Sequence, residues 1–282
     1  MTSPKTLLRA WNIKAKKRLG QHFLVDTATA EMIVERAKLS SHDIVLEIGA
    51  GLGALTIPVS RAAAKVLAVE KDPQLWDLLK TELLINKVAN VTIIPENILH
   101  VDLPSIGEAC GAPLVVIGNL PYNISSQVLI QLIHSRLWIN RAVLMFQKEL
   151  AQRITAHPGT KEYGRLTVML RYCADVKPLS TIKASVFFPA PKVASEILEI
   201  KFKALPDYPR HDEAKLFKVV KAAFGNRRKT LKNALAASGL HIDPQTALHA
   251  LNMAGIDPTR RAETLSVAEF VSLQISLSQI EP

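Results

Sequence analysis

The chain has 282 residues, 48% of them hydrophobic and 21% charged, and it carries a net charge of +10 with a pI of about 9.6. This length suits one large domain and a small second one, and the composition excludes a fibrous or strongly disordered chain. Cys110 and Cys173 stand far apart without metal-ligand spacing, which argues against a disulfide framework or a zinc site. The positive charge attracts polyanions, so it moderately favours a nucleic-acid partner over a merely solvated basic surface.

The first residues are basic, and the first acidic residue is Asp26. A signal peptide would need an apolar stretch after such charges, and none follows. No segment reaches the apolar length of a transmembrane helix. We therefore expect a cytoplasmic protein with no membrane partner.

Strand-like and helix-like stretches alternate over the first half of the chain. Asp26 can cap a helix over 26–39, and Asp72 followed by Pro73 opens a helix that runs to about Asn86. The expected strands are 44–48, 65–70, 91–94, 114–117 and 142–146, and the further helices are 54–63, 124–134 and 148–156. This alternation predicts a doubly wound, parallel α/β sheet of Rossmann-like type.

The pattern changes later in the chain. Two late strands are expected at 176–181 and 196–202, around a proline-rich loop, and 204–212 has the composition of a linker. Only helices are expected beyond it, with starts at Asp243-Pro244 and at the capping box Ser266-x-x-Glu269. We predict two domains, residues 1–205 and residues 206–282, of which the second is small and all-helical.

A glycine-rich turn follows the strand 44–48. The segment 47–53 (EIGAGLG) spaces its glycines as GxGxG, whereas the dinucleotide fingerprint is GxGxxG. Glycines allow a sharp turn and a close approach to a ligand, although many turns use them for structural reasons alone. Glu70 lies 17 residues after Gly53, at the end of the next strand. An acid there can accept hydrogen bonds from both ribose hydroxyls of a nucleoside, although by itself it could be a solvated carboxylate or a helix-cap partner.

The tetrapeptide Asn119-Leu120-Pro121-Tyr122 follows the fourth strand and resembles the (N/D)PP(Y/F) motif of amino-methyltransferases. An adenine amine is a poor nucleophile because its lone pair is delocalised into the ring. The side-chain carbonyl of Asn119 and the backbone carbonyl of Leu120 can each accept one hydrogen bond from it, which favours a localised lone pair. Pro121 stiffens the turn, and Tyr122 can stack on an extruded base. The alternative is a structural Asn-x-Pro turn with a packing tyrosine.

Six segments, in this order, resemble the family of ribosomal RNA small-subunit adenine dimethyltransferases of the KsgA/RsmA type, over essentially the whole chain. They are 17–24 (KRLGQHFL), 47–53 (EIGAGLG), 119–122 (NLPY), 158–166 (PGTKEYGRL), 187–193 (FFPAPKV) and 224–231 (FGNRRKTL).

The resemblance implies a class I methyltransferase sheet, S-adenosylmethionine as cofactor and no metal. It implies two adjacent dimethyladenosines near the 3′ end of small-subunit RNA, formed by a monomer late in assembly, on a nearly complete small subunit. The implied cofactor contacts are His22 and Leu24 at the methionine end, Gly49 and Gly51 along the backbone, Glu70 at the ribose, Asn97 at the adenine, and Asn119. The implied contacts to the target adenine are Asn119 and Leu120 at its amine, with Tyr122 and Phe187 on its two faces.

Two positions depart from the family, which usually has aspartate where this chain has Asn97 and Ala194. Asn97 can still accept a hydrogen bond from the cofactor's adenine amine, more weakly than a charged aspartate, or it can merely cap the following turn. The change at Ala194 concerns the order of the loop behind Phe187.

Two basic clusters are candidates for RNA binding. A charge run is usually a solvated helix face, and the family resemblance moves the interpretation towards phosphate contacts. Because no RRM or KH module is present, specificity is expected from RNA shape and the ribosomal context. The clusters are Lys16, Lys17 and Arg18, and Arg227, Arg228 and Lys229.

Three other functions are compatible with part of the pattern. An Erm-type enzyme would methylate a large-subunit adenine, but the segments 187–193 and 224–231 favour the small-subunit family. A ribosome-assembly factor could keep the fold without needing turnover, but the intact Glu70 and NLPY motif argue against lost activity. The glycine spacing disfavours a nicotinamide dehydrogenase.

Overall fold

The computed structural model describes residues 4–280, and the side chains of Lys5 and Lys17 lie outside that description. The chain forms two compact units, one made of residues up to Ala151 with Asp175–Ala204, the other of Gln152–Ala174 with the chain from Leu205 onward. The sequence-based division had placed residues 152–174 in the first domain. They belong to the second unit because the helix within them packs against later helices of that unit.

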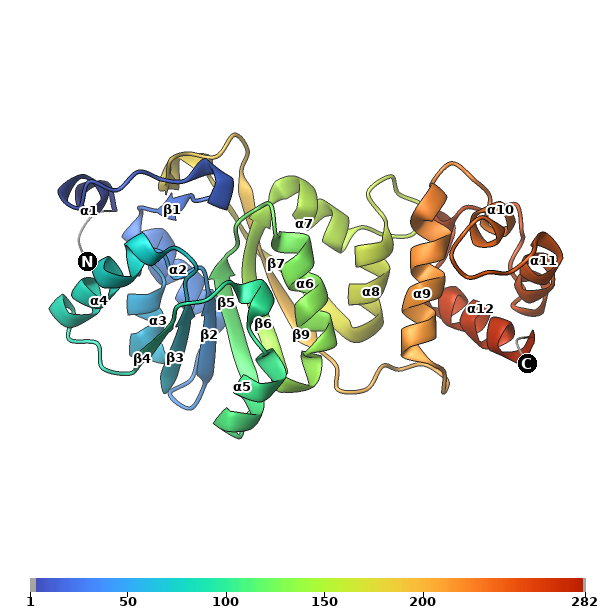
Figure 1. Ribbon diagram of the computed structural model, residues 1–282, viewed down its shortest axis with the longest axis horizontal. Coiled ribbons are helices and arrows are strands. Elements are labelled where there is room, and N and C mark those ends of the chain that lie inside the picture. Colours follow the sequence, from blue (N-terminus) through green and yellow to red (C-terminus); the bar gives the residue numbers. More distant parts are fainter. Residues whose placement is uncertain (1–3, 281–282) are drawn as a thin grey trace. The chain divides into compact units, whose positions relative to one another are not determined.

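The first unit alternates strands and helices (Figure 1). Its elements are α1 (Pro4–Ala10), β1 (Phe23–Leu24), α2 (Thr27–Ala37), β2 (Ile44–Ile48), α3 (Thr56–Ala62), β3 (Lys65–Val69), α4 (Pro73–Ile85), β4 (Val91–Ile94), α5 (Leu103–Cys110), β5 (Leu114–Asn119), α6 (Ser125–His134), β6 (Ile139–Gln147), the start of α7 (Lys148–Thr155), β7 (Ala174–Ile182), β8 (Phe187–Phe188) and β9 (Ser195–Phe202). In the described residues, no helix is long and apolar enough to cross a bilayer.

Seven strands form the main sheet in the order β4-β3-β2-β5-β6-β9-β7. The strands from β4 to β6 run parallel, and β9 runs antiparallel to β6. The predicted doubly wound α/β sheet is therefore confirmed. The strand order reverses between β2 and β5, where Ile48 pairs with Gly118, so the carboxyl ends of these two strands lie side by side. Such a switch point is where open α/β sheets bind ligands.

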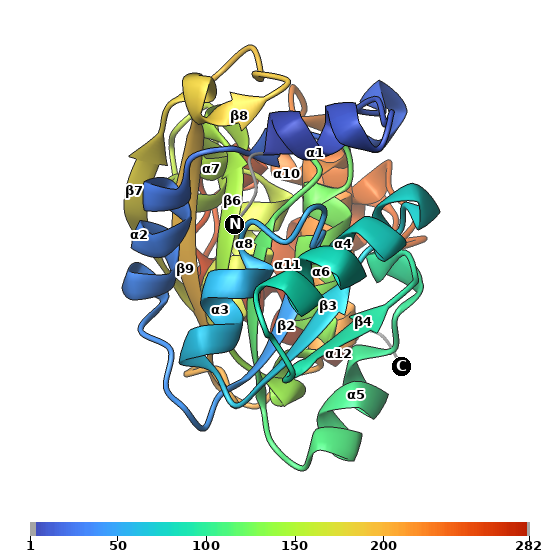
Figure 2. The ribbon, with the colours of Figure 1, turned by 90° about the vertical axis from the view of Figure 1, so that its left-hand side faces the viewer.

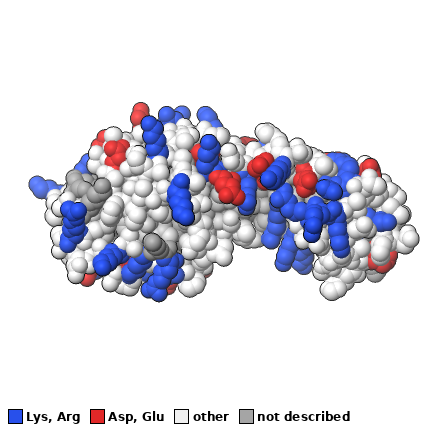
Figure 3. Space-filling view, turned by 90° about the horizontal axis from the view of Figure 1, so that it is seen from above, with Lys and Arg blue, Asp and Glu red and all other residues white. Residues whose placement is uncertain are grey.

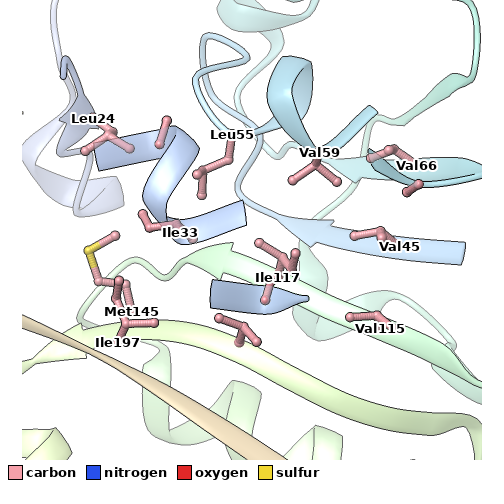
Figure 4. Close-up of a cluster of buried hydrophobic side chains, with 14 of the residues drawn as sticks. Leu24, Ile33, Val45, Leu55, Val59, Val66, Val115, Ile117, Met145 and Ile197 are labelled. Carbon is pink, nitrogen blue, oxygen red and sulfur yellow. The ribbon is translucent and has the colours of Figure 1, made fainter. Parts of the chain in front are cut away.

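Apolar side chains, many of them β-branched, form a core cluster between this sheet and its helices (Figure 4). Val45, Val66 and Val115 occupy neighbouring strands in register and are at most 1% exposed. They pack with Ile33 of α2 and Val59 of α3. Each such buried side chain contributes about 1.5–3 kcal/mol of transfer free energy, so the sheet and helices are fixed as one body.

The predicted helix starts agree with the structure. The Asp26 side chain accepts a hydrogen bond from the Thr29 amide, and Asp72 accepts one from the Gln74 amide. The sequence did not predict α1, α5 and the later helix α8. In α5, Pro104 and Gly107 obscure the helical pattern, because both residues have low helix propensity.

A small second sheet joins two distant parts of the first unit. β1 pairs antiparallel with β8, placing Phe23 opposite Phe188 and Leu24 opposite Phe187. Figures 1 and 2 show the N-terminal segment and β8 at the same end of the main sheet. This pairing brings residues before α2 next to the proline-rich loop.

The second unit is helical, as predicted for the C-terminal part of the chain. Its capping box is formed reciprocally: the Ser266 amide donates to Glu269 Oε2 at 2.7 Å, and the Glu269 amide donates to Ser266 Oγ at 3.2 Å. The predicted cap Asp243 accepts from the two following amides. The helices are α8 (Arg165–Cys173), α9 (Glu213–Ala223), α10 (Leu231–Ala236), α11 (Pro244–Met253) and α12 (Val267–Ile280).

Candidate active site

A cavity of about 230 Å³ opens in the first unit at the carboxyl ends of β2, β3 and β5. It therefore lies at the switch point of the sheet, where a ligand is expected. Its wall is made of residues 18–24, 47–52, 54–55, 69–71, 75, 96–99 and 119–124.

The glycine-rich turn forms the floor between β2 and α3. Gly49 and Gly53 have φ angles of +77° and +83°, in the left-handed region that glycine adopts readily. A Cβ on Gly49 would have the carbonyl oxygen of Asn119 as its nearest neighbour, at 3.7 Å, whereas one on Gly53 would come within 3.0 Å of Leu79 Cδ1 in the core. Gly49 thus leaves space that a ligand can use, and Gly53 serves packing.

Glu70 directly follows the next strand, β3, and both of its carboxylate oxygens accept backbone hydrogen bonds. Oε2 accepts from the Gly51 amide at 2.8 Å and Oε1 from the Asp72 amide at 2.7 Å. Burial raises the pKa of Glu70, and these hydrogen bonds oppose the rise. Each carboxylate oxygen retains a further lone pair, so the fixed carboxylate fits a pair of ribose hydroxyls.

Asn97 lines the cavity and also caps a short 3₁₀ turn, because its Oδ1 accepts from the Leu99 amide at 3.3 Å. The two roles that the sequence left open are therefore compatible. The contact of Asn97 with an adenine amine stays a prediction.

Asn119 stands at the end of β5 with its side-chain amide held in one orientation. Its Nδ2 donates to the backbone oxygen of His22 at 2.8 Å. Because a carbonyl oxygen can only accept, this contact fixes which end of the amide is the nitrogen, and it leaves Oδ1 as the acceptor. The buried side chain of Leu120 and the hydrogen bond from Ser125 Oγ to the Pro121 carbonyl anchor the rest of the motif.

Tyr122 is held by two neighbours. Its hydroxyl lies 2.9 Å from Ser195 Oγ, which is fully buried, and its ring stacks on His22 with centroids 5.3 Å apart. Burial raises the pKa of Tyr122, so the phenol stays protonated. His22 Nδ1 lies 2.7 Å from the carbonyl oxygen of Pro189, where it donates. The sequence did not single out Ser195, although its place at the start of the strand after the proline-rich loop is a usable signal.

Phe187 is held in the apolar core beside β1. Its ring is 3% exposed and packs in the core cluster with Leu24 and Ile197, while the next ring, Phe188, is 37% exposed. The cause is the pairing of β1 with β8, which sets Phe187 opposite the buried Leu24. The ring of His22 stacks on Tyr122, and the contact of Phe187 with the target base stays a prediction.

Glu47 is a residue of the site that the sequence left without a role. It lines the cavity, is 1% exposed, and its Oε2 has no hydrogen-bond partner within the described residues. Burial raises its pKa to about 7, with the nearby Glu70 adding to the rise and the Thr56 hydroxyl opposing it. An unpartnered polar atom of this kind fits a ligand with a polar group.

The residues of the first basic cluster lie in different surroundings. Lys16 does not present a free cation, because its ammonium pairs with Asp72 at 2.7 Å. Its contact with RNA stays a prediction. Arg18 is exposed at the rim of the cavity, and the side chain of Lys17 lies outside the described residues.

The second basic cluster lies in the second unit, between a short turn at 224–226 and α10. Arg227 donates to the Lys161 carbonyl and is 54% exposed, and Arg228 and Lys229 are exposed. Lys and Arg side chains are spread over much of the face shown in Figure 3. Within the part of the chain that the structure describes, no group of three His, Cys, Asp or Glu side chains is placed to hold a metal ion.

The open glycine turn, the fixed carboxylate of Glu70 and the oriented Asn119 meet at one edge of a parallel sheet. Together they define a class I methyltransferase domain with a site for S-adenosylmethionine.

The comparisons name the family within this class. The family described as ribosomal RNA adenine dimethylase matches residues 12–279, and this chain belongs to it. The chain is 50% identical to a protein of Desulforapulum autotrophicum called ribosomal RNA small subunit methyltransferase A, over 98% of this chain and 97% of that one. It is 41% identical to a protein of the same name from Magnetococcus marinus, over 95% and 94%.

Solved structures agree. A dimethyladenosine transferase from Plasmodium falciparum is 26% identical and superposes with a TM-score of 0.76, over 92% of this chain and 98% of that one. The 23S rRNA methyltransferase ErmE is 25% identical, with a TM-score of 0.66 over 91% and 100%. The protein is therefore an S-adenosylmethionine-dependent ribosomal RNA adenine methyltransferase.

Proposed function

We propose that this enzyme dimethylates two adjacent adenosines near the 3′ end of small-subunit ribosomal RNA, on a nearly assembled small subunit in the cytoplasm. The names of the relatives support the small subunit as the substrate. The net positive charge of the chain supports a substrate rich in phosphate. The observation that carries the chemistry is the hydrogen bond from Asn119 Nδ2 to the His22 carbonyl.

The cofactor, when bound, supplies an electrophilic methyl group on its sulfonium. The chain's own residues position the nucleophile. Asn119 Oδ1 and the Leu120 carbonyl can each accept a hydrogen bond from an adenine amine, which localises its lone pair. Because the His22 carbonyl holds Asn119, these acceptors need no rearrangement when the base arrives.

Tyr122 offers an aromatic surface to a base that has been extruded from its helix. Its hydroxyl is tied to the buried Ser195, so the plane of the ring is set before RNA binds. No side chain has to form a covalent bond with the substrate in this scheme.

The mechanism is tested by Asn119→Ala. We expect this variant to fold and to bind RNA, and to lose about two orders of magnitude in turnover, the usual scale for removing a preorganised polar contact. Asn140→Ala is the matched control, because Asn140 lies at the amino end of β6, away from the cavity. Near-normal methyl transfer by Asn119→Ala would contradict the proposed mechanism.

The substrate is tested by supplying unmethylated small and large subunits with labelled cofactor. Small subunits are expected to accept up to four methyl groups, two on each of two neighbouring adenosines, and large subunits none. Primer extension across the small-subunit RNA of a strain lacking the gene, with and without complementation, locates the positions. Labelling of large-subunit RNA would contradict this proposal and support the Erm-type function.

A further inference from the structure

Asp72 is a buried carboxylate beside the cofactor cavity that receives side chains from the N-terminal segment (residues 16–24). Its Oδ1 lies 2.7 Å from the Lys16 ammonium, and its Oδ2 accepts from Gln21 Nε2 at 2.8 Å. Gln21 Oε1 in turn accepts from the Lys16 amide at 2.8 Å. These three residues form a closed ring of hydrogen bonds between α4 and the N-terminal segment.

The ring is more than a surface ion pair. The Asp72 side chain is 1% exposed and that of Lys16 is 25% exposed. Burial alone would raise the pKa of Asp72, but the hydrogen bonds from Lys16, Gln21 and Gln74 outweigh it and keep the pKa below its usual value. A carboxylate this deeply buried is costly unless it is paired, so the chain has a strong preference for keeping Lys16 and Gln21 in place.

The ring also contacts the site directly. The Asp72 amide donates to Glu70 Oε1, on the carboxylate that we expect to hold the ribose. Gln21 immediately precedes His22, whose carbonyl holds Asn119 and whose ring stacks on Tyr122. Farther along the segment, Phe23 shares an apolar cluster with Leu75 and Leu78 of α4, and β1 pairs with β8. The ring supplies the polar side-chain tie to α4 for the first half of the segment, before these apolar contacts begin.

We propose that Asp72 is a positioning residue of the cofactor site: through Lys16 and Gln21 it holds the N-terminal segment against the cavity, and Lys16 serves the cofactor site rather than RNA. A helix cap alone would not need these two side chains. The Gln74 amide already accounts for the capping role of Asp72.

The test measures affinity for S-adenosylhomocysteine by calorimetry, without RNA and without turnover. Asp72→Asn keeps the helix cap, since asparagine caps helices as well as aspartate does. The variant loses the negative charge that faces Lys16. It also sets an amide nitrogen, which can only donate, opposite the donating amide nitrogen of Gln21. We expect its dissociation constant to rise about tenfold or more. Lys16→Met should weaken binding in the same direction.

The decisive variant exchanges the two partners. In Asp72→Asn combined with Gln21→Glu, the residue at 72 donates and the residue at 21 accepts, so every hydrogen bond of the ring can form again and the total charge is unchanged. We expect this double variant to bind within about threefold of wild type, while Gln21→Glu alone, which sets two carboxylates face to face, binds weakly.

Hydrogen exchange of the cofactor-free protein gives an independent readout. The amides of residues 16–24 should exchange faster in Asp72→Asn and return to wild-type protection in the double variant. Asp102→Asn is the control, because Asp102 caps α5 in the same manner but lies outside the cavity wall. The proposal is overturned if folded Asp72→Asn or Lys16→Met binds within about twofold of wild type, or if the double variant is no better than Asp72→Asn.

Discussion

Glu47 gives the sharpest test of the electrostatics of the site. Its carboxyl is 1% exposed, and burial raises its pKa from 4.5 to about 7. Below pH 4.5 the carboxyl is protonated in both the folded and the unfolded chain. As the pH rises from 4.5 to 7, the unfolded chain loses the proton while the folded chain keeps it, so the free energy of unfolding falls.

The size of this loss follows from the two pKa values. A rise from 4.5 to about 7 corresponds to a decrease of about 3 kcal/mol, complete once the pH exceeds 7. Glu47→Gln cannot ionise, so it should lose this part of the pH dependence. Glu70, whose pKa is also raised, is present in both proteins, and its own contribution largely cancels in the comparison.

The assay is urea unfolding of the cofactor-free chain between pH 4.5 and pH 8, for wild type and Glu47→Gln. The mutant can be less stable at low pH, because its buried amide gains an unpaired donor; the change with pH is therefore the quantity to compare. We expect the difference between mutant and wild type to shift by about 3 kcal/mol in favour of the mutant from pH 4.5 to pH 7. Parallel stability profiles would show that Glu47 is ionised in the folded protein and would refute the reasoning.

Three further predictions concern ligand binding. Gly49→Val should abolish S-adenosylmethionine binding, because the side chain would enter the cavity. Gly111→Ala is the control, since Gly111 also has a positive φ angle but has open space around it. This control should keep normal affinity for the cofactor and lose about 1–2 kcal/mol in stability. Asn97→Asp should tighten cofactor binding by about several-fold to tenfold and Asn97→Leu should weaken it, since a charged acceptor binds the adenine amine more strongly. Wild-type affinity in Asn97→Leu would leave only the capping role seen in the structure. Replacing Arg227 and Arg228 with glutamate should weaken binding to small subunits and flatten its salt dependence; an unchanged salt slope would remove these residues from the RNA interface.

The sheet could be predicted because its signals are local. The strand 44–48 and its neighbours are short runs of Val, Ile and Leu between turn residues, and Asp26 and Asp72 mark helix starts by their own side-chain chemistry. The division into units could not be predicted from the sequence, since residues 152–174 join the second unit through contacts with helices far along the chain. Nothing in the sequence of that segment distinguishes the two outcomes.

The site divides in the same way. Glu70 and Asn119 were found because each follows a strand at the ligand-binding edge of the sheet. The burial of Phe187 depends on the register of β1 with β8, and the pairing of Lys16 with Asp72 joins residues 56 positions apart. A lysine among other basic residues looks like an RNA contact until the carboxylate that it neutralises is located in space.

The pairing of β1 with β8 has a consequence for how the protein is made. One wall of the cofactor cavity comes from residues 18–24, but the strand that holds it, β8, is synthesised only at residues 187–188. During translation the N-terminal residues leave the ribosome long before their partner exists. The parallel strands from β2 to β6 can assemble earlier, since all of them lie before residue 148. The nascent chain therefore gains its five parallel strands first and its complete cavity later, so a truncated product ending before β8 would keep the parallel strands and yet lack both β9 and a closed site for the cofactor.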